Sequence, residues 1–213
     1  MTEIEFFFDP SCPFCWITSR WLLEVQGERD IDITWRQFSL AIKNKELAND
    51  GSDESPHGEV HRAAHNVNRV ILAAVEQGAS AIDLYTAFGT RNHIDGREYD
   101  DAMITEVLAE QGLSADLAKA AQDTSYDAKL EKELQSALDA AGGEVGVPTI
   151  VFTGKDGKRL GYFGPVLNEM PEREEGLAIW DGLEKLATVT SFYELKRTRP
   201  KGGPDTASTA GRS

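Results

Sequence analysis

The chain has 213 residues, of which 40% are hydrophobic, enough for a folded domain with a sizeable core and too many for a disordered chain. Lys and Arg number 22 against 36 Asp and Glu, which gives a formal net charge of −14. This balance argues against nucleic acids and anionic membranes as partners, because clustered positive charge recognises both.

The first residues of the chain lack the features of a secretion signal. Glu3 and Glu5 stand where such a signal has a basic start, and no long apolar run follows them. No stretch of the sequence approaches the ~20 apolar residues of a membrane-spanning helix. We therefore expect a cytoplasmic protein.

The sequence contains two cysteines, Cys12 and Cys15. A structural disulfide stabilises a fold by closing a long loop, and the loop between these two residues is very short. In a reducing compartment such a pair is instead expected to be catalytic or to bind a metal.

The N-terminal part of the sequence predicts a strand, a helix and a second strand. Residues 4–8 and 31–38 are short runs rich in β-forming side chains. Between them, residues 12–26 carry apolar side chains at helical spacing and end before Gly27. A strand–helix–strand unit of this length predicts two parallel strands.

The remainder of the sequence predicts mostly helix. Apolar residues recur at helical spacing through residues 56–141. Strand character returns at residues 149–152 and 159–163, which flank a turn and predict a hairpin, and a last helix is expected over residues 172–187. The tail, residues 200–213, is rich in Gly, Pro, Ser and Thr and is expected to be disordered.

The stretch Cys12-Pro13-Phe14-Cys15 opens the first predicted helix. A helix N-terminus favours a thiolate at Cys12, and Pro13 suits the first turn because its missing N–H costs nothing there. Cys12 would attack a disulfide sulfur, and Cys15 would resolve the mixed disulfide. The alternative is half a zinc site or two inert thiols, but zinc requires four ligands and no second cysteine pair exists.

Val147 and Pro148 lie just before a predicted strand, after the long helical segment. In folds of the thioredoxin type a proline at this place is cis and packs against the active-site disulfide. A cis X–Pro bond is rare and is normally kept for such a local purpose. The alternative is an ordinary proline at a strand edge.

Three further sets of side chains are candidates for function. Glu5 lies in the first strand, where a buried carboxyl could accept the proton of the resolving thiol; the alternative is a strand end in water. The second set shares one face of a predicted helix, at a spacing that can bind a metal: His57, His61 and His65. No further ligand completes that site, so we expect solvated or partner-facing histidines and no metal. The third set could steer an anionic thiol or partner, but is expected to be ordinary surface charge: Arg20, Lys196, Arg197 and Arg199.

The run Phe8-Asp9-Pro10-Ser11-Cys12-Pro13-Phe14-Cys15-Trp16 resembles the DsbA-like oxidoreductases of actinobacteria. It is most similar to the mycothiol-dependent branch, which includes the mycothiol-dependent nitroreductase and the DsbA-type mycoredoxins. Residues 39–42, 163–166 and 194–199 look like the same family. The resemblance therefore covers nearly the whole chain except the tail.

This resemblance implies a DsbA-like α/β thioredoxin fold, βαβ then ββα, with a large α-helical insertion. The thioredoxin-fold domain would comprise residues 1–42 and 145–199, and the insertion residues 43–144. Mycothiol would serve as thiol co-substrate, with no bound cofactor.

The resemblance also implies roles for residues of the site. It implies that Cys12 is the nucleophile, that Cys15 is the resolving thiol and that Pro148 faces the substrate. The residues beside these three are expected to contact the substrate as well: Pro13, Phe14 and Val147. Asn44 and His93 match positions around the pocket of the nitroreductase branch. Phe14 departs from that branch, which has a Trp between its cysteines.

The sequence therefore predicts a thiol–disulfide oxidoreductase of the mycoredoxin type. Its expected partners are mycothiol and S-mycothiolated or disulfide-bonded proteins, peroxidases among them, in oxidative-stress defence. Phe14 favours a reductase, because it cannot supply the charge with which a His at this place stabilises the thiolate of an oxidase. The alternatives are a mycothiol-dependent nitroreductase and a substrate-holding or chaperone module without turnover. The oligomeric state, monomer or homodimer, is left open.

Overall fold

The computed structural model describes residues 1–48, 55–154 and 156–212. The chain divides into two compact units, each described by itself. The sheet unit contains residues 1–7, 12–34 and 137–213, and the helical unit contains residues 8–11 and 35–136. These units do not follow the predicted domain boundaries at residues 42 and 145.

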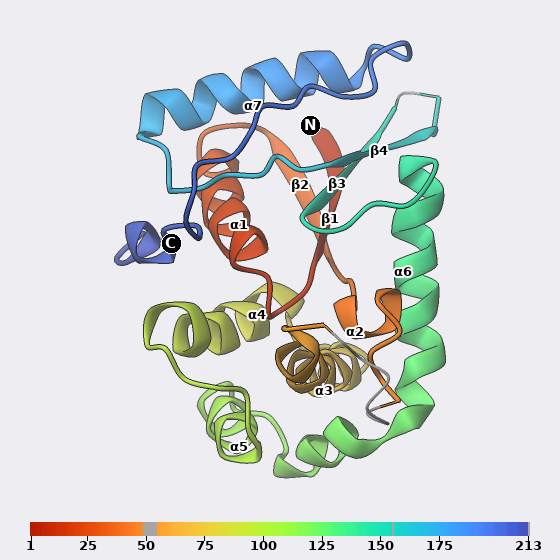
Figure 1. Cartoon of the computed structure of the whole chain (residues 1–213), viewed down its shortest axis with the longest axis vertical. Coiled ribbons are helices and arrows are strands. Elements are labelled where there is room, and N and C mark those ends of the chain that lie inside the picture. Colours follow the sequence, from red (N-terminus) through yellow and green to blue (C-terminus); the bar gives the residue numbers. More distant parts are fainter. Residues whose placement is uncertain (49–54, 155, 213) are drawn as a thin grey trace. The chain divides into compact units, whose positions relative to one another are not determined.

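Four strands form one sheet in the order β2-β1-β3-β4 (Figure 1). Their bounds are β1 Thr2–Phe8, β2 Ile31–Gln37, β3 Thr149–Thr153 and β4 Arg159–Phe163. β3 pairs antiparallel with both β1 and β4, so that Val151 lies opposite Glu5 on one side and Gly161 on the other.

The strands β1 and β2 run in the same direction. The N–H of Thr2 bonds to the carbonyl of Asp30 at the start of both strands, and the N–H of Phe38 bonds to the carbonyl of Phe8 at their ends. The parallel pair and the βαβ…ββα order confirm the fold expected from the sequence.

Two helices of the sheet unit pack through tryptophans. They are α1, Pro13–Gln26, and α7, Arg173–Ala187. The rings of Trp21 on α1 and Trp180 on α7 lie 6.3 Å apart, and the ring of Phe152 on β3 lies 5.9 Å from Trp180. The indole N–H of Trp21 donates to the carbonyl of Gly176 at 3.0 Å. Trp180 therefore joins both helices to the sheet.

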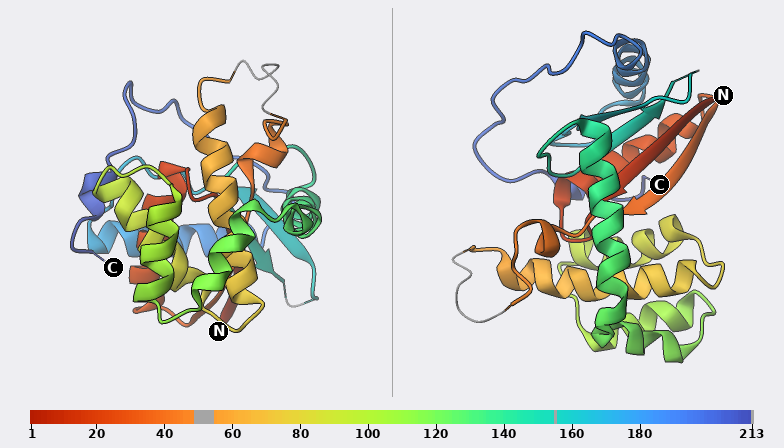
Figure 2. Two further views of the ribbon diagram at one scale, coloured as in Figure 1. Left: turned by 90° about the horizontal axis from the view of Figure 1, so that it is seen from below. Right: turned by 90° about the vertical axis from the view of Figure 1, so that its right-hand side faces the viewer.

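The helical unit follows the predicted helical spacing. Its elements are α2 Leu40–Lys43, α3 Gly58–Val75, α4 Ala81–Gly89, the π-helical turn Thr90–Ile94, α5 Asp101–Glu110, the 3-10 turns Ala115–Gln122 and Thr124–Tyr126, and α6 Asp127–Ala141, whose last residues belong to the sheet unit. Figure 2 shows these helices in two further views. Their starts are fixed by short polar side chains that accept backbone N–H bonds, such as Ser39, Ser80 and Asp100.

The expected disorder of the tail, residues 200–213, is wrong for its last part. Asp205 caps a 3-10 turn, Thr206–Thr209. The indole N–H of Trp16 on α1 donates to the buried Thr209 hydroxyl at 2.9 Å. Arg212 pairs with both carboxylate oxygens of Glu24 at 2.8 and 2.9 Å. Composition misleads here because small side chains also allow a turn to pack closely on a helix.

Among the described residues, no helix is both long enough and apolar enough to cross a membrane.

Two glycines offer a matched test of packing in the sheet unit. A methyl group at Gly161 would lie 2.8 Å from backbone atoms of Ala140 and Ala141 at the end of α6, whereas one at Gly182 on α7 would meet no atom within 4 Å. Gly161→Ala should therefore lower the free energy of unfolding by about 1–3 kcal/mol. Gly182→Ala should raise it by roughly 0.5–1 kcal/mol, because alanine favours helix. Urea unfolding of both variants measures this, and equal midpoints would contradict it.

Candidate active site

Cys12 and Cys15 lie at the start of α1, both in the thiol form. Cys12 is the N-cap residue, with extended backbone angles (φ −82°, ψ 111°), and its side chain makes no capping hydrogen bond. Pro13 occupies the first helical position, and the N–H of Trp16 bonds to the carbonyl of Cys12 at 3.1 Å. Cys12 is 8% exposed and Cys15 is fully buried, so solvent reaches Cys12 alone of the pair.

The segment before β3 lies against this helix start. The Val147–Pro148 peptide bond is cis, and both residues are buried. The thiol of Cys12 donates to the carbonyl oxygen of Val147 at 3.6 Å. The structure thus brings together three of the predicted site residues, Cys12, Val147 and Pro148.

A second cis peptide bond, Gly164–Pro165, lies in a segment that contacts both Pro148 and α1. The N–H of Gly164 bonds to the carbonyl of Pro148 at 2.8 Å, and the hydroxyl of Thr18 on α1 donates to the carbonyl of Pro165 at 2.9 Å. Gly164 has φ +107°, which a side chain would strain. Sequence reasoning did not assign these residues to the site. The signal was the Gly-Pro pair directly after a predicted strand.

Phe14, between the two cysteines, contacts the C-terminal part of the chain. The guanidinium carbon of Arg199 lies 4.8 Å from the centre of its ring. A cation at this distance from an aromatic face is attracted by the ring. Pro13 and Phe14 are each half-buried, so both present part of their surface to solvent.

Asp9, three residues before Cys12, is buried in the helical unit. One carboxylate oxygen accepts the N–H and hydroxyl of Ser11, and the other accepts the N–H of Leu40 at 2.9 Å. Burial raises the pKa of Asp9, and the hydrogen bonds from Leu40 and Ser11 partly oppose that rise. Sequence reasoning missed this role, although Asp before Pro is typical of a turn that its own side chain closes.

The carbonyl of Pro10 accepts hydrogen bonds from two side chains of the helical unit. The hydroxyl of Tyr99 donates to it at 2.7 Å, and Nε2 of His93 lies 2.8 Å away. Because a carbonyl only accepts, Nε2 of His93 carries a proton. Burial, with Asp9 as a smaller contribution, raises the pKa of Tyr99 well above its ordinary value and keeps its hydroxyl a donor. Two side chains therefore fix the backbone two residues before Cys12.

The other predicted site residues have different neighbours. Asn44 ends α2 and donates to a carboxylate oxygen of Glu46 at 3.3 Å, so its contact is separate from that of His93. Glu5 on β1 pairs with Arg159 on β4 through both carboxylate oxygens at 2.9 and 2.8 Å. Glu5 is thus half-buried in an ion pair. The sequence had suggested either a buried proton acceptor or a strand end in water, and neither describes this pairing.

The expectation of solvated or partner-facing histidines is wrong for His61 and His65. Nδ1 of His61 lies 2.6 Å from the buried Glu46 carboxylate. His65 is 1% exposed and lies 2.9 Å from both the Ser39 hydroxyl and the Asp127 carboxylate. Burial lowers the pKa of His65, so it holds α2, α3 and α6 together as a neutral ring. No group of three potential metal ligands occurs among the described residues.

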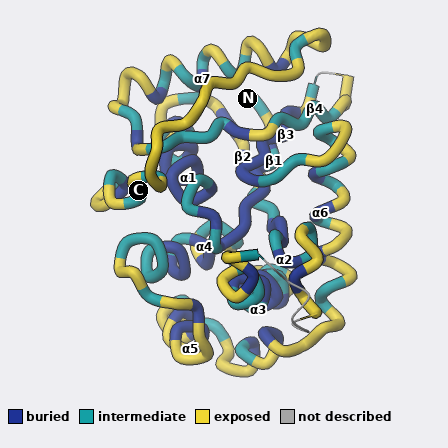
Figure 3. Tube along the Cα trace, viewed as in Figure 1, coloured by how far each residue is buried: buried dark blue, intermediate teal, exposed yellow. Residues whose placement is uncertain are grey.

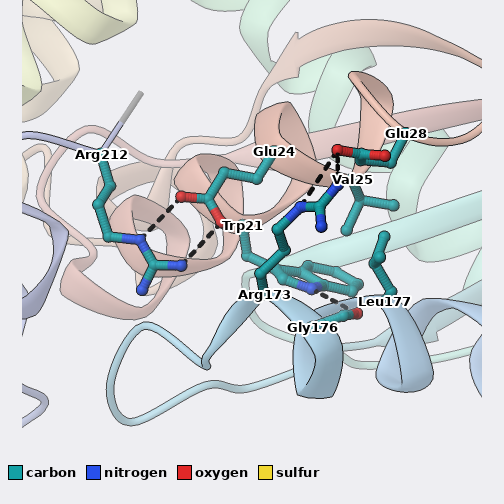
Figure 4. A pocket seen from close by; sticks show the side chains of 8 residues that line it. All are labelled: Trp21, Glu24, Val25, Glu28, Arg173, Gly176, Leu177 and Arg212. Atoms are coloured by element: carbon teal, nitrogen blue, oxygen red, sulfur yellow. Dashed lines mark hydrogen bonds and ion pairs between the residues drawn. The ribbon is translucent and has the colours of Figure 1, made fainter.

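A pocket of about 210 Å³ lies between α1, α7 and the C-terminal turn (Figure 4). Its charged walls are paired, Arg173 with Glu28 and Arg212 with Glu24. Neither cysteine lines it, so it is separate from the thiol pair.

The fold and the start of α1 together define the class of protein, a DsbA-like thioredoxin fold with two thiols at the start of its first helix. The chain belongs to the family described as the mycothiol-dependent nitroreductase Rv2466c, whose sequence pattern matches residues 11–197. Membership confirms the actinobacterial family expected from the sequence.

Known proteins agree with this assignment. The chain is 32% identical over 209 residues to the uncharacterised protein Rv2286c of Mycobacterium tuberculosis, covering 96% of this chain and 85% of that protein. A probable DsbA oxidoreductase of Streptomyces coelicolor, SCO1869, superposes with a TM-score of 0.57 at 20% identity, over 96% and 97% of the two chains. The cytosolic disulfide reductase DsbM of Pseudomonas aeruginosa superposes with a TM-score of 0.57 at 15% identity, over 86% and 99%. At these identities the structures establish the fold.

Asp9 predicts a pH dependence of stability. Burial raises its pKa in the folded protein above the ordinary value of 3.8, so the folded chain keeps a proton that the unfolded chain has released. The stability contributed by Asp9 is therefore fully present below that value and is lost as pH rises through the folded pKa. Asp9→Asn removes this titration. Urea unfolding at a series of pH values gives the free energy of unfolding of both proteins. The value for wild type minus that for the variant should fall as pH rises from acid to neutral. A constant difference would contradict the prediction.

Proposed function

We propose that the chain reduces mycothiol mixed disulfides and protein disulfides in a reducing, cytoplasmic setting. The observation that carries this proposal is the position of Cys12 as the N-cap of α1, with its thiol 3.6 Å from the carbonyl of Val147. The positive end of the helix favours the thiolate, which is the attacking species.

In the first step, the Cys12 thiolate attacks the mycothiol sulfur of an S-mycothiolated protein. A Cys12–mycothiol disulfide forms, and the protein leaves as a thiolate that takes up a proton. Pro148 and Val147 are proposed to hold the substrate beside Cys12, with Pro13 and Phe14 contacting it.

Two routes can then restore Cys12. In the monothiol route a second mycothiol attacks the adduct, releases mycothiol disulfide and leaves the Cys12 thiolate. In the dithiol route Cys15 attacks Cys12, releases mycothiol and forms a Cys12–Cys15 disulfide that further mycothiol reduces. In both routes one mixed disulfide and one mycothiol become, in sum, a protein thiol and mycothiol disulfide, with no bound cofactor needed.

Three other residues keep subsidiary roles in the proposal. His93 acts by holding the Pro10 carbonyl, and Asn44 is a substrate-binding candidate beside α2. Proton transfer by Glu5 is disfavoured, because its ion pair with Arg159 occupies both carboxylate oxygens. The same fold serves this chemistry elsewhere: DsbM of Pseudomonas aeruginosa is described as a cytosolic disulfide reductase and has been solved with glutathione.

The first test is turnover of a mycothiol mixed disulfide, coupled through mycothione reductase to NADPH. Cys12→Ser should abolish the activity, because the hydroxyl is no nucleophile at neutral pH. Cys15→Ser should retain it if the monothiol route operates and lose it if the dithiol route does.

The control is wild-type protein whose thiols are shown to be reduced. A reduced wild type without activity would contradict the reductase proposal. In that case a substrate-holding module, measured as binding without turnover, would explain the fold and the family.

The second candidate function is mycothiol-dependent nitroreduction, which the family description favours. Phe14 stands where that branch has a Trp, so we expect wild type to reduce a nitroaromatic compound much more slowly than a mixed disulfide. Phe14→Trp should then change the ratio of the two activities in favour of the nitroaromatic. Nitroreduction is measured as the loss of nitro-group absorbance. If wild type reduced the nitroaromatic compound faster than the mixed disulfide, nitroreduction would become the first candidate function.

A further inference from the structure

The segment between α7 and the C-terminal turn, residues 188–205, is here called the C-terminal strap. It has no helix or strand and is exposed along most of its length (Figure 3). Its contacts with the rest of the sheet unit include Phe192, whose ring lies 6.1 Å from that of Tyr162 and whose carbonyl accepts the Tyr162 hydroxyl at 3.4 Å. Arg199 lies on Phe14, and the N–H of Asp205 bonds to the carbonyl of Asn168 at 2.7 Å.

The strap carries positive charge that the rest of the chain does not neutralise. Its cations are all exposed and lie within residues 196–201, a stretch that has no acidic residue and is flanked by Glu194 and Asp205: Lys196, Arg197, Arg199 and Lys201. Within the described parts of the chain, none of the four has a carboxylate partner. Elsewhere in the sheet unit, Arg29 and Arg159 are paired with carboxylates. On a chain of net charge −14, an unneutralised basic cluster stands out as the place that attracts a negative partner.

The same strap exposes large apolar side chains. Tyr193 is 83% exposed and Leu195 is 84% exposed, directly before the basic cluster. Exposed aromatic and apolar side chains next to Arg are typical of protein interfaces. An unstructured backbone can also pair with an extended segment of a partner. Phosphate polymers and anionic membranes would use the cations but would meet the repulsion of the acidic remainder of the surface.

We propose that the C-terminal strap docks an acidic, extended segment of the substrate protein. This inference rests on the proposed reductase function and names the kind of protein on which it acts. Arg199 contacts Phe14, the residue between Cys12 and Cys15, so a segment bound along the strap lies beside the thiol pair. The strap supplies charge complementarity and apolar contact, and the thiols supply the chemistry.

The test uses the full chain with three strap cations neutralised: Lys196→Gln, Arg197→Gln and Lys201→Gln together. Arg199 stays, because it contacts the active-site helix. The probe is a short fluorescein-labelled peptide rich in Asp and Glu, with its binding read by fluorescence anisotropy. The variant should bind it about tenfold more weakly, the size expected of three exposed ion pairs. Added salt should weaken wild-type binding in the same direction.

The matched control removes the same charge elsewhere: Lys132→Gln, Lys158→Gln and Lys185→Gln, all exposed. It should bind the acidic peptide within about twofold of wild type, because these three lysines lie outside the basic cluster of residues 196–201. Equal losses in both triple variants would overturn the proposal, as would tighter wild-type binding to an RNA oligonucleotide or to phosphatidylserine vesicles than to the peptide.

Turnover separates this inference from the proposed function. The strap variant should reduce bis(2-hydroxyethyl) disulfide at the wild-type rate and lose about tenfold in kcat/KM on the acidic peptide carrying a mycothiol mixed disulfide. Wild type that binds the peptide but reduces neither disulfide would refute the reductase function and leave the docking surface standing. Equal kcat/KM of wild type and variant on the peptide would refute the docking surface alone.

Discussion

The start of α1 is the constraint on which the rest of the site depends. Pro13 begins the helix without an N–H to satisfy, and the side chain of Cys12 makes no capping hydrogen bond. The sulfur therefore stays at the positive end of the helix, where a thiolate is stabilised and a disulfide can be attacked. A Ser or Asp cap would satisfy the helix better and would have no such chemistry.

Tertiary contacts hold this helix start from several directions within each unit. In the sheet unit, the cis-proline segment supplies the Val147 carbonyl to Cys12, and Thr18 binds the second cis-proline segment. In the helical unit, Asp9 closes the turn that leads to the cysteine, and Tyr99 fixes the carbonyl after it. Most of these contacts use backbone groups, which substitution of neighbouring side chains leaves in place.

The thiol pair and the basic strap are carried by different residues of the chain. The family match covers residues 11–197, which include both cysteines and most of the basic strap. The basic strap belongs to the sheet unit, and its Arg199 contacts Phe14. No residue of the strap lines the pocket between α1 and α7. Specificity for a protein partner and reactivity toward sulfur would thus reside in neighbouring but separate residues.

The sequence by itself determined the strands, the first helix and the thiol pair, because local spacing and one short motif encode them, whereas the structure decided that the Val147–Pro148 bond is cis. Only the tertiary structure decided that Asp9 and His65 are buried, that Glu5 pairs with Arg159, and that Thr209 packs on α1. These outcomes depend on partners far away in the chain, which no local pattern specifies. The sequence alone does not distinguish an exposed polar side chain from a buried one, because burial requires a hydrogen-bond partner that is distant in the chain.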